Sequence, residues 1–134
     1  MTARETLENC RALVIECQQI SRLIESVFLP GARGCASPKF GGVPSGGQSA
    51  GERLDMYEIW LVKDQAEAAL LVADVERMAD TLPQDQAKVI NWYYCEAMID
   101  AVIAARLGLG RSTITERRDA AVHVLQDRFN GEDG

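Results

Sequence analysis

Four arginines, Arg106, Arg111, Arg117 and Arg118, lie close together near the end of a chain whose formal net charge is −6. Only one acidic residue, Glu116, lies between positions 106 and 118. Guanidinium groups pair with phosphate oxygens and with guanine edges, so a cluster of this kind is typical of a surface that contacts duplex DNA. The alternative is a solvent-exposed helix whose arginines pair with neighbouring acids.

Hydroxyl residues accompany these arginines along one predicted helix. In a helix-turn-helix, the N-terminal part of the second helix lies in the major groove, where Ser and Thr contact phosphates or bases. The candidate DNA-contacting residues are Arg106, Arg111, Ser112, Thr113, Thr115, Glu116, Arg117 and Arg118. Those that we rank first are Arg111, Ser112, Thr113 and Thr115. Arg118 and Asp119 are expected to point outward with them.

The stretch IDAVIAARLGLGRSTITERRDAAVHVL contains the elements that would position these side chains. After Pro83, the apolar pattern predicts three short helices, at about 84–95, 100–107 and 111–128. Gly108 can adopt the left-handed conformation that ends a helix, Gly110 fits the next N-cap, and Leu109 is expected to fill the core from the turn. Inward-facing positions are predicted at Ile103, Leu107, Ile114, Ala121, Val122 and Leu125. Short helices with short connections favour a helix-turn-helix domain over residues 84–129.

Two longer helices are predicted before this domain. An N-terminal amphipathic helix at 1–29 and a long helix at 52–83 both carry apolar residues at spacings of three and four. The segment between them, 30–51, is rich in Gly, Pro and Ser and is expected to be a flexible linker, and residues 130–134 are expected to form a disordered tail. The long helices could pack as an antiparallel hairpin within one chain, or could join a second copy in a homodimer.

The composition excludes several classes of protein. A chain of 134 residues holds one compact domain, or a small domain with a helical extension. No apolar run approaches the roughly 20 residues of a transmembrane helix, and the N-terminus lacks the apolar segment of a signal peptide, so we expect a cytoplasmic protein with no membrane contact. The cysteines, Cys10, Cys17, Cys35 and Cys95, form no CxxC pair, and His123 lacks an acidic or cysteine partner at metal-ligand spacing. We therefore expect no metal, no cofactor and no catalytic residue.

The stretch YYCEAMIDAVIAARLGLGRSTITERRDAAVHVL resembles the C-terminal region-four module of bacterial sigma factors. In that module a tyrosine-ended helix precedes a helix-turn-helix, whose last helix reads promoter DNA. The order of segments along the whole chain resembles small phage-encoded late transcriptional regulators of the ArpU and RinA type, with ASPKFGGVPSGGQSAGERLD as the Ser/Gly/Pro-rich segment. The resemblance implies an all-α phage or prophage regulator of late genes that acts in the bacterial host cell.

Three positions depart from the sigma-like pattern. Arg117 stands where an apolar residue is usual, Ala97 where a glycine is common, and Ile99 where Ser or Thr would cap the first motif helix. Asp100 is expected to take over this capping role. Arg117 could pack its aliphatic stem inward and keep its charge in water, and a small rotation of the helix would exchange Arg117 for Arg118.

These observations predict a non-enzymatic, sequence-specific DNA-binding transcriptional regulator. The first alternative is an antiterminator or anti-sigma-like adaptor that binds RNA polymerase through the same fold. The net acidity favours this alternative, because a general DNA-binding protein usually carries more positive charge. The second alternative is a small terminase-like subunit for DNA packaging, although there the DNA-binding motif tends to precede the oligomerising helices, the reverse of the order in this chain.

Overall fold

The computed structural model describes residues 2–28 and 50–130, and every regular element within these ranges is helical, as the sequence predicts. The α-helices are α1 (Ala3–Phe28), α2 (Ala50–Ala79), α3 (Gln84–Ile90), α4 (Asp100–Leu107) and α5 (Arg111–Leu125). Two π-helical turns, η2 (Asn91–Cys95) and η3 (Gln126–Asn130), continue α3 and α5. The predicted linker, with Cys35, and the predicted tail lie largely outside the described residues, although Ala50 and Gly51 belong to α2 rather than to the linker.

A reciprocal pair of hydrogen bonds fixes the start of α1. The backbone N–H of Thr2 donates to Glu5 Oε1 at 3.0 Å, and the backbone N–H of Glu5 donates to Thr2 Oγ1 at 3.1 Å. This capping box satisfies N–H groups that have no acceptor inside the helix. The hydrogen bonds from Thr2 also lower the pKa of Glu5.

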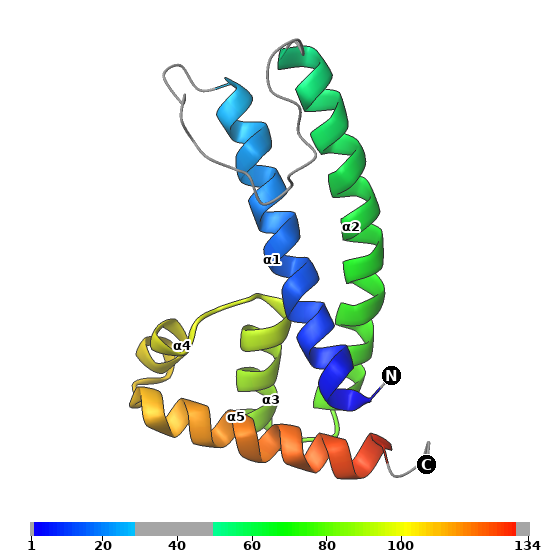
Figure 1. Ribbon diagram of the computed structural model, residues 1–134. Coiled ribbons are helices and arrows are strands. Elements are labelled where there is room, and N and C mark those ends of the chain that lie inside the picture. The colour runs from blue at the N-terminus through cyan, green and yellow to red at the C-terminus, as the bar shows by residue number, and fades with distance from the viewer. Residues whose placement is uncertain (1, 29–49, 131–134) are drawn as a thin grey trace.

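The two long helices, α1 and α2, lie side by side and run in opposite directions (Figure 1). α1 buries Leu7, Cys10 and Ile20, and α2 buries Tyr57 and Val75. These residues belong to the predicted apolar stripes, because repeats of three and four residues return to one face of a helix. The stripe of α2 therefore packs within its own chain.

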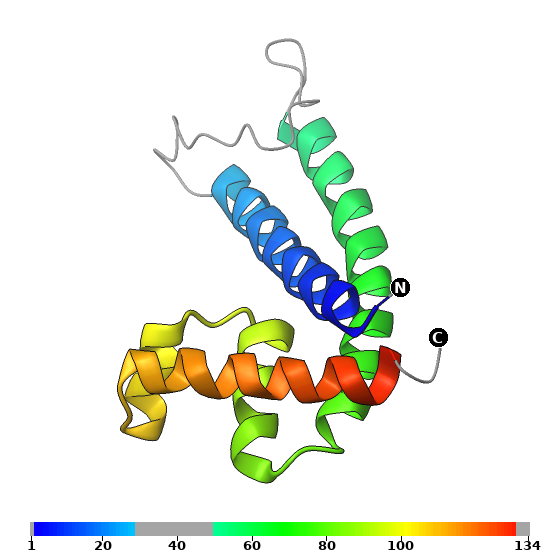
Figure 2. The ribbon, with the colours of Figure 1, turned by 60° about the horizontal axis from the view of Figure 1, so that its bottom comes forward.

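The last helix, α5, crosses the end of the molecule where α1 begins and α2 ends (Figure 2). Two hydrogen bonds hold η3 there. The backbone N–H of Arg4 donates to Gln126 Oε1 at 2.8 Å, and Arg128 Nη1 donates to the carbonyl oxygen of Thr81 at 2.6 Å. Segments from opposite ends of the sequence thus meet beside α5.

The interior divides into two groups of buried side chains. The main core joins α1, α2, α3, η2 and the second half of α5, and its buried members are Ala3, Leu7, Cys10, Val75, Met78, Ala79, Leu82, Ile90, Tyr94, Ala121, Val122 and Leu125. The small core lies between α3, α4 and the first half of α5, and its buried members are Val89, Ile103, Ala104 and Ile114. The predicted inward positions of α4 and α5 fall in these two cores, with Leu107 packed at the edge of the small core.

The turn between α4 and α5 has the predicted glycine conformations. Gly108 caps α4 in the left-handed region with φ 69°, and Gly110 is the extended N-cap of α5. The prediction for Leu109 is wrong, because its side chain is 37% exposed instead of filling the core. The backbone N–H of Leu109 donates to the carbonyl oxygen of Ala104 at 3.0 Å, which keeps the residue at the end of α4. The small core beside this turn is filled by residues of α3, α4 and α5 and not by Leu109.

The connection from η2 to α4 contains a strained residue, Ala97. Its φ is 57°, and no other non-glycine residue in the described ranges has a positive φ. A side chain with a Cβ costs about 1–2 kcal/mol in this conformation, which glycine adopts freely. The connection is closed by the backbone N–H of Met98, which donates to the carbonyl oxygen of Trp92 at 3.0 Å.

Candidate nucleic-acid interface

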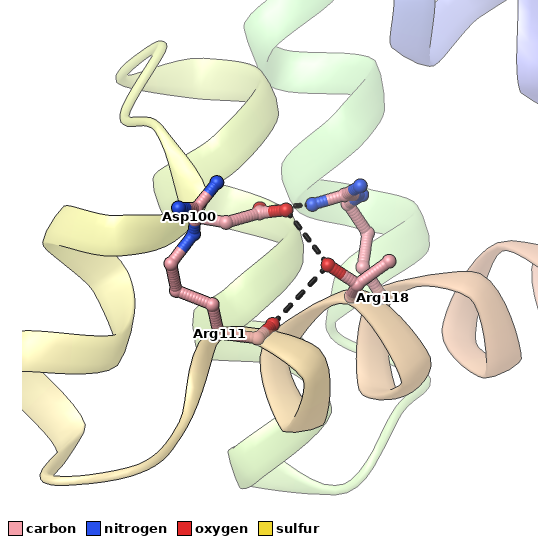
Figure 3. A network of polar contacts seen from close by, with 4 residues as sticks. Asp100, Arg111 and Arg118 are labelled. Atoms are coloured by element: carbon pink, nitrogen blue, oxygen red, sulfur yellow. Dashed lines mark hydrogen bonds and ion pairs between the residues drawn. The ribbon is translucent and has the colours of Figure 1, made fainter.

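Asp100, the first residue of α4, is the centre of a polar network that joins α4 to α5 (Figure 3). Thr115 Oγ1 donates to Asp100 Oδ2 at 2.9 Å, and Arg118 Nη1 donates to Asp100 Oδ1. The side chains of Arg118 and Asp100 are only 14% and 19% exposed, so their attraction is screened less than that of a surface pair. The network ties the start of α4 to the middle of α5.

The guanidinium of Arg118 also packs on an aromatic ring. Its Cζ lies 4.0 Å from the centroid of the Tyr93 ring, and the Cζ of Arg11, from α1, lies 4.1 Å from the same centroid. The prediction that Arg118 points outward is therefore wrong, because the ring and the carboxylate of Asp100 hold it on the inner side of α5. In the structure, Arg118 is a residue that positions α5.

The prediction that Asp100 caps α4 is also wrong. The N-cap of α4 is Ile99, which provides no side-chain hydrogen bond. Asp100 does not replace it, because its carboxylate accepts hydrogen bonds from Thr115 and Arg118 of α5. The negative charge of Asp100 still lies in the first turn of α4, where it interacts favourably with the helix dipole.

Arg117 forms a longer ion pair, with Asp85 of α3. Arg117 Nη1 lies 3.9 Å from Asp85 Oδ2, and the two side chains are 27% and 60% exposed. An ion pair of this length near the surface contributes little stability. Two charges of the arginine cluster are thus offset by Asp85 and Asp100, acids that lie outside positions 106–118.

The first turn of α5 presents an exposed guanidinium, an exposed hydroxyl and uncapped backbone N–H groups, which are groups of the kind that bind phosphate in proteins. Arg111 and Ser112 are exposed, and the guanidinium of Arg111 has no hydrogen-bond or ion-pair partner among the residues that the structure describes. Gly110 offers no side-chain cap, and the first intrahelical bond is donated by the backbone N–H of Ile114, to the carbonyl oxygen of Gly110 at 3.2 Å. The backbone N–H groups of residues 111–113 therefore have no acceptor within the helix. They form the positive end of the helix dipole.

The remaining candidate residues divide by their surroundings. Arg106 and Glu116 are exposed, and Arg106 Cζ lies 5.6 Å from the centroid of the Trp92 ring. Thr113 is half-buried. Thr115 is also half-buried, and its hydroxyl oxygen lies 3.2 Å from the carbonyl oxygen of Arg111 as well as beside Asp100. The predicted site thus separates into an exposed set and a set that is held by contacts inside the chain.

Cys10, Cys17, Cys95 and His123 lie within the described residues, where their surroundings can be compared with those of metal sites and reactive thiols. Within residues 2–28 and 50–130, no three His, Cys, Asp or Glu side chains gather as metal ligands would. A hydrogen bond with Cys10, together with burial, raises the pKa of Cys95, and burial raises the pKa of Cys17, so these thiols remain protonated at neutral pH. The prediction that His123 lacks an acidic partner is wrong, because Asp127 lies one turn later, 3.6 Å from its Nε2, on the exposed surface.

Comparisons with protein-family models, with curated proteins and with solved structures found no match to this chain. In the part of the chain that the structure describes, no helix has both the length and the apolar character that crossing a membrane requires.

Proposed function

We propose that this chain is a sequence-specific DNA-binding transcriptional regulator of the phage late-regulator type, in which α4 and α5 act as a sigma region-four-like helix-turn-helix. The observation that carries the proposal is the first turn of α5, where Arg111 and Ser112 are exposed beside uncapped N–H groups. This is the part of a recognition helix that enters the major groove.

Two backbone angles on either side of α4 support the proposed sigma-like helix-turn-helix. Gly108 adopts a φ of 69° at the end of α4, and Ala97 adopts a φ of 57° shortly before α4 begins. The sigma-like pattern commonly has glycine at position 97, and glycine is the residue that adopts such a φ without strain. A positive φ at position 97 is what a glycine there would allow, so this connection is compatible with the sigma-like pattern.

The candidate residues have two kinds of role in this proposal. Arg111 pairs with a base edge, while Ser112, Thr113 and the free N–H groups of the first turn bind phosphate. Arg106, at the end of α4, adds a second phosphate contact, and Glu116 accepts a hydrogen bond from a cytosine amino group. The residues that hold α5 at its angle to α4 are Asp100, Thr115 and Arg118.

The proposal is tested by selecting bound sequences from randomised duplex DNA over a series of salt concentrations. We expect enrichment of a short motif. Arg111→Ala should weaken binding to that motif by roughly tenfold to a hundredfold, because one base-reading guanidinium is lost. The matched control is Arg22→Ala, which removes the same charge from an exposed position on α1 and should leave the affinity nearly unchanged.

Two results would contradict the proposal. One is the absence of both enrichment and binding at low salt, where phosphate contacts are strongest. The other is an equal loss of affinity for Arg111→Ala and Arg22→Ala, because this would mean that only the overall charge of the chain matters.

A second candidate function, an adaptor that binds RNA polymerase, is favoured by exposed apolar residues around α4. Ile99, Val102 and Leu109 are 58%, 40% and 37% exposed. Ile99 and Val102 are three residues apart and share a face, and exposed apolar side chains in a group are typical of protein interfaces. Under this alternative, Val102→Asp abolishes capture of purified polymerase and Arg111→Glu does not. Under the DNA-binding proposal, Arg111→Glu abolishes DNA binding and Val102→Asp preserves it.

A further inference from the structure

α2 carries a second row of apolar side chains, which the packing with α1 leaves exposed. Ile59, Val62 and Leu70 are 67%, 66% and 72% exposed. We call this set the outer row, and its members are Ile59, Val62, Ala66, Ala69, Leu70 and Ala73, all of them exposed. Three large apolar side chains at this level of exposure on one helix require an explanation, because water contact disfavours each of them.

The spacing of the outer row is that of a coiled-coil seam. Positions 59, 62, 66, 69 and 73 alternate by three and four residues, which is the repeat at which two helices pack knobs into holes. At 100° per residue, this row falls nearly opposite the buried residues Tyr57, Ala68 and Val75. The next positions of the repeat on either side are Asp55 and Glu76, so the apolar seam is limited to about 21 Å of helix.

We propose that the outer row binds a second copy of this chain, with the two α2 helices parallel and in register. The charges beside the row identify this partner. Glu58 and Lys63 flank the row on opposite sides and are five residues apart, which are the positions that form ion pairs between the strands of a parallel coiled coil. Glu58 of each copy then faces Lys63 of the other. Neither residue takes part in an ion pair within the described ranges of one chain.

An antiparallel pairing of the same row does not use these charges. It would separate Glu58 of one copy from Lys63 of the other by roughly three helical turns. The parallel arrangement also stacks identical positions of the row, so Ala66, Ala69 and Ala73 face their own counterparts. These small side chains allow the two backbones to approach closely over that part of the seam.

The short seam is sufficient because α2 is already folded. An isolated helix must recover its own ordering entropy from the interface, whereas α1 and the main core hold α2 helical before any partner binds. The interface therefore has to offset only the association of two preformed surfaces.

A parallel pair places both copies of α5 at the same end of the dimer, because α5 crosses the end of α2 in each copy (Figure 2). This consequence rests on the proposed function. Two α4–α5 units at one end suit a DNA site with two half-sites, since the symmetry of such a site mirrors that of the dimer. An antiparallel pair would leave the units at opposite ends of helices that are about 45 Å long.

Sedimentation equilibrium of the full chain, without DNA, tests this proposal. We expect a mass of about twice the 14.7 kDa of one chain. Val62→Glu and Leu70→Glu should both yield the mass of one chain while circular dichroism stays unchanged, because the two side chains are exposed in the monomer. The matched control, Val102→Asp, introduces a charge at an exposed apolar residue of α4 and should remain dimeric.

Charge exchange tests the orientation. Glu58→Lys and Lys63→Glu should each weaken the dimer, and the double exchange should restore it, since the pairs re-form with their signs reversed. A wild-type monomer at all concentrations, a dimer that survives both substitutions in the row, a larger assembly, or no rescue by the double exchange would overturn the proposal. DNA selection is measured separately, so a monomer that enriches a single short motif would refute the dimer and leave the proposed function standing.

Discussion

The main core and the small core hold α5 in different ways. The second half of α5 belongs to the main core, which has twelve buried side chains and also joins α1, α2, α3 and η2. The first half of α5 belongs to the small core, which has four buried side chains, and it also contacts Asp100 of α4. The half of α5 that presents Arg111 is thus the less strongly held one. The difference indicates that the candidate interface can be disturbed without unfolding the rest of the chain. Five substitutions and two control variants test this.

Leu125→Ala should have the largest effect. Leu125 is fully buried in the main core, and its truncation leaves a cavity that costs about 4 kcal/mol of unfolding free energy. Urea denaturation measures this loss. Leu109→Ala removes the same atoms from a side chain that is 37% exposed, and it should cost less than half as much. Equal losses would contradict the placement of Leu109 at the surface.

Ile103→Ala should lower the free energy of unfolding by about 3 kcal/mol. Unlike Leu125→Ala, it should weaken mainly the small core. Ile103 is fully buried in the small core, so its truncation loosens α4 and the first half of α5 first. Hydrogen exchange should accelerate in α4 at denaturant concentrations where α1 remains protected. Uniform acceleration in both helices would show that the two cores unfold as one unit.

Asp100→Ala should cost about 2 kcal/mol, because it leaves the guanidinium of Arg118 without its carboxylate in a site that is only 14% exposed. Thr115 also loses one of its two acceptors and keeps only the carbonyl oxygen of Arg111. The control is Asp85→Ala, which removes the exposed, 3.9 Å ion pair with Arg117 and should change stability by less than about 0.5 kcal/mol. Thermal denaturation of the two variants compares them directly, and a larger loss for Asp85→Ala would refute the role given to Asp100.

The smallest effects are expected on either side of α4, with opposite signs. Gly108→Ala should cost about 1 kcal/mol, because the left-handed φ of 69° strains a Cβ even though no atom lies within 4 Å of it. Ala97→Gly should stabilise the chain by up to about 1 kcal/mol by relieving the same strain at a φ of 57°. Changes of the same sign at both positions would show that the backbone relaxes in one of the variants.

Helix positions could be predicted because their signals are local. Pro83 marks the start of α3, Gly108 and Gly110 mark the turn, and the repeats of three and four residues mark the buried faces of α1 and α2. The outer row of α2 is not among the features predicted from the sequence, although its repeat is equally visible there. One apolar stripe is enough to predict a helix, so a second stripe adds nothing to that prediction.

The contacts around Asp100 could not be predicted, because they depend on the angle at which α4 crosses α5. Asp100 is 15 and 18 residues from Thr115 and Arg118, and no periodicity connects residues across a turn. The position of Tyr93 beside Arg11 and Arg118 likewise requires α1 to lie next to η2. The residue types in the arginine cluster indicate a positive surface. Asp85 and Asp100, which lie outside the cluster, form ion pairs with Arg117 and Arg118, and the sequence does not reveal these pairs.

The contact between the two ends of the described chain also governs the order of folding. Leu7 and Leu125 share the main core, and the backbone N–H of Arg4 donates to Gln126, 122 residues later. During synthesis α1 must wait for the last helix to leave the ribosome before its core is complete, so α1 and α2 expose apolar surface for most of translation. The small core closes between positions 89 and 114 and requires only short loops, and it can form as soon as α5 emerges.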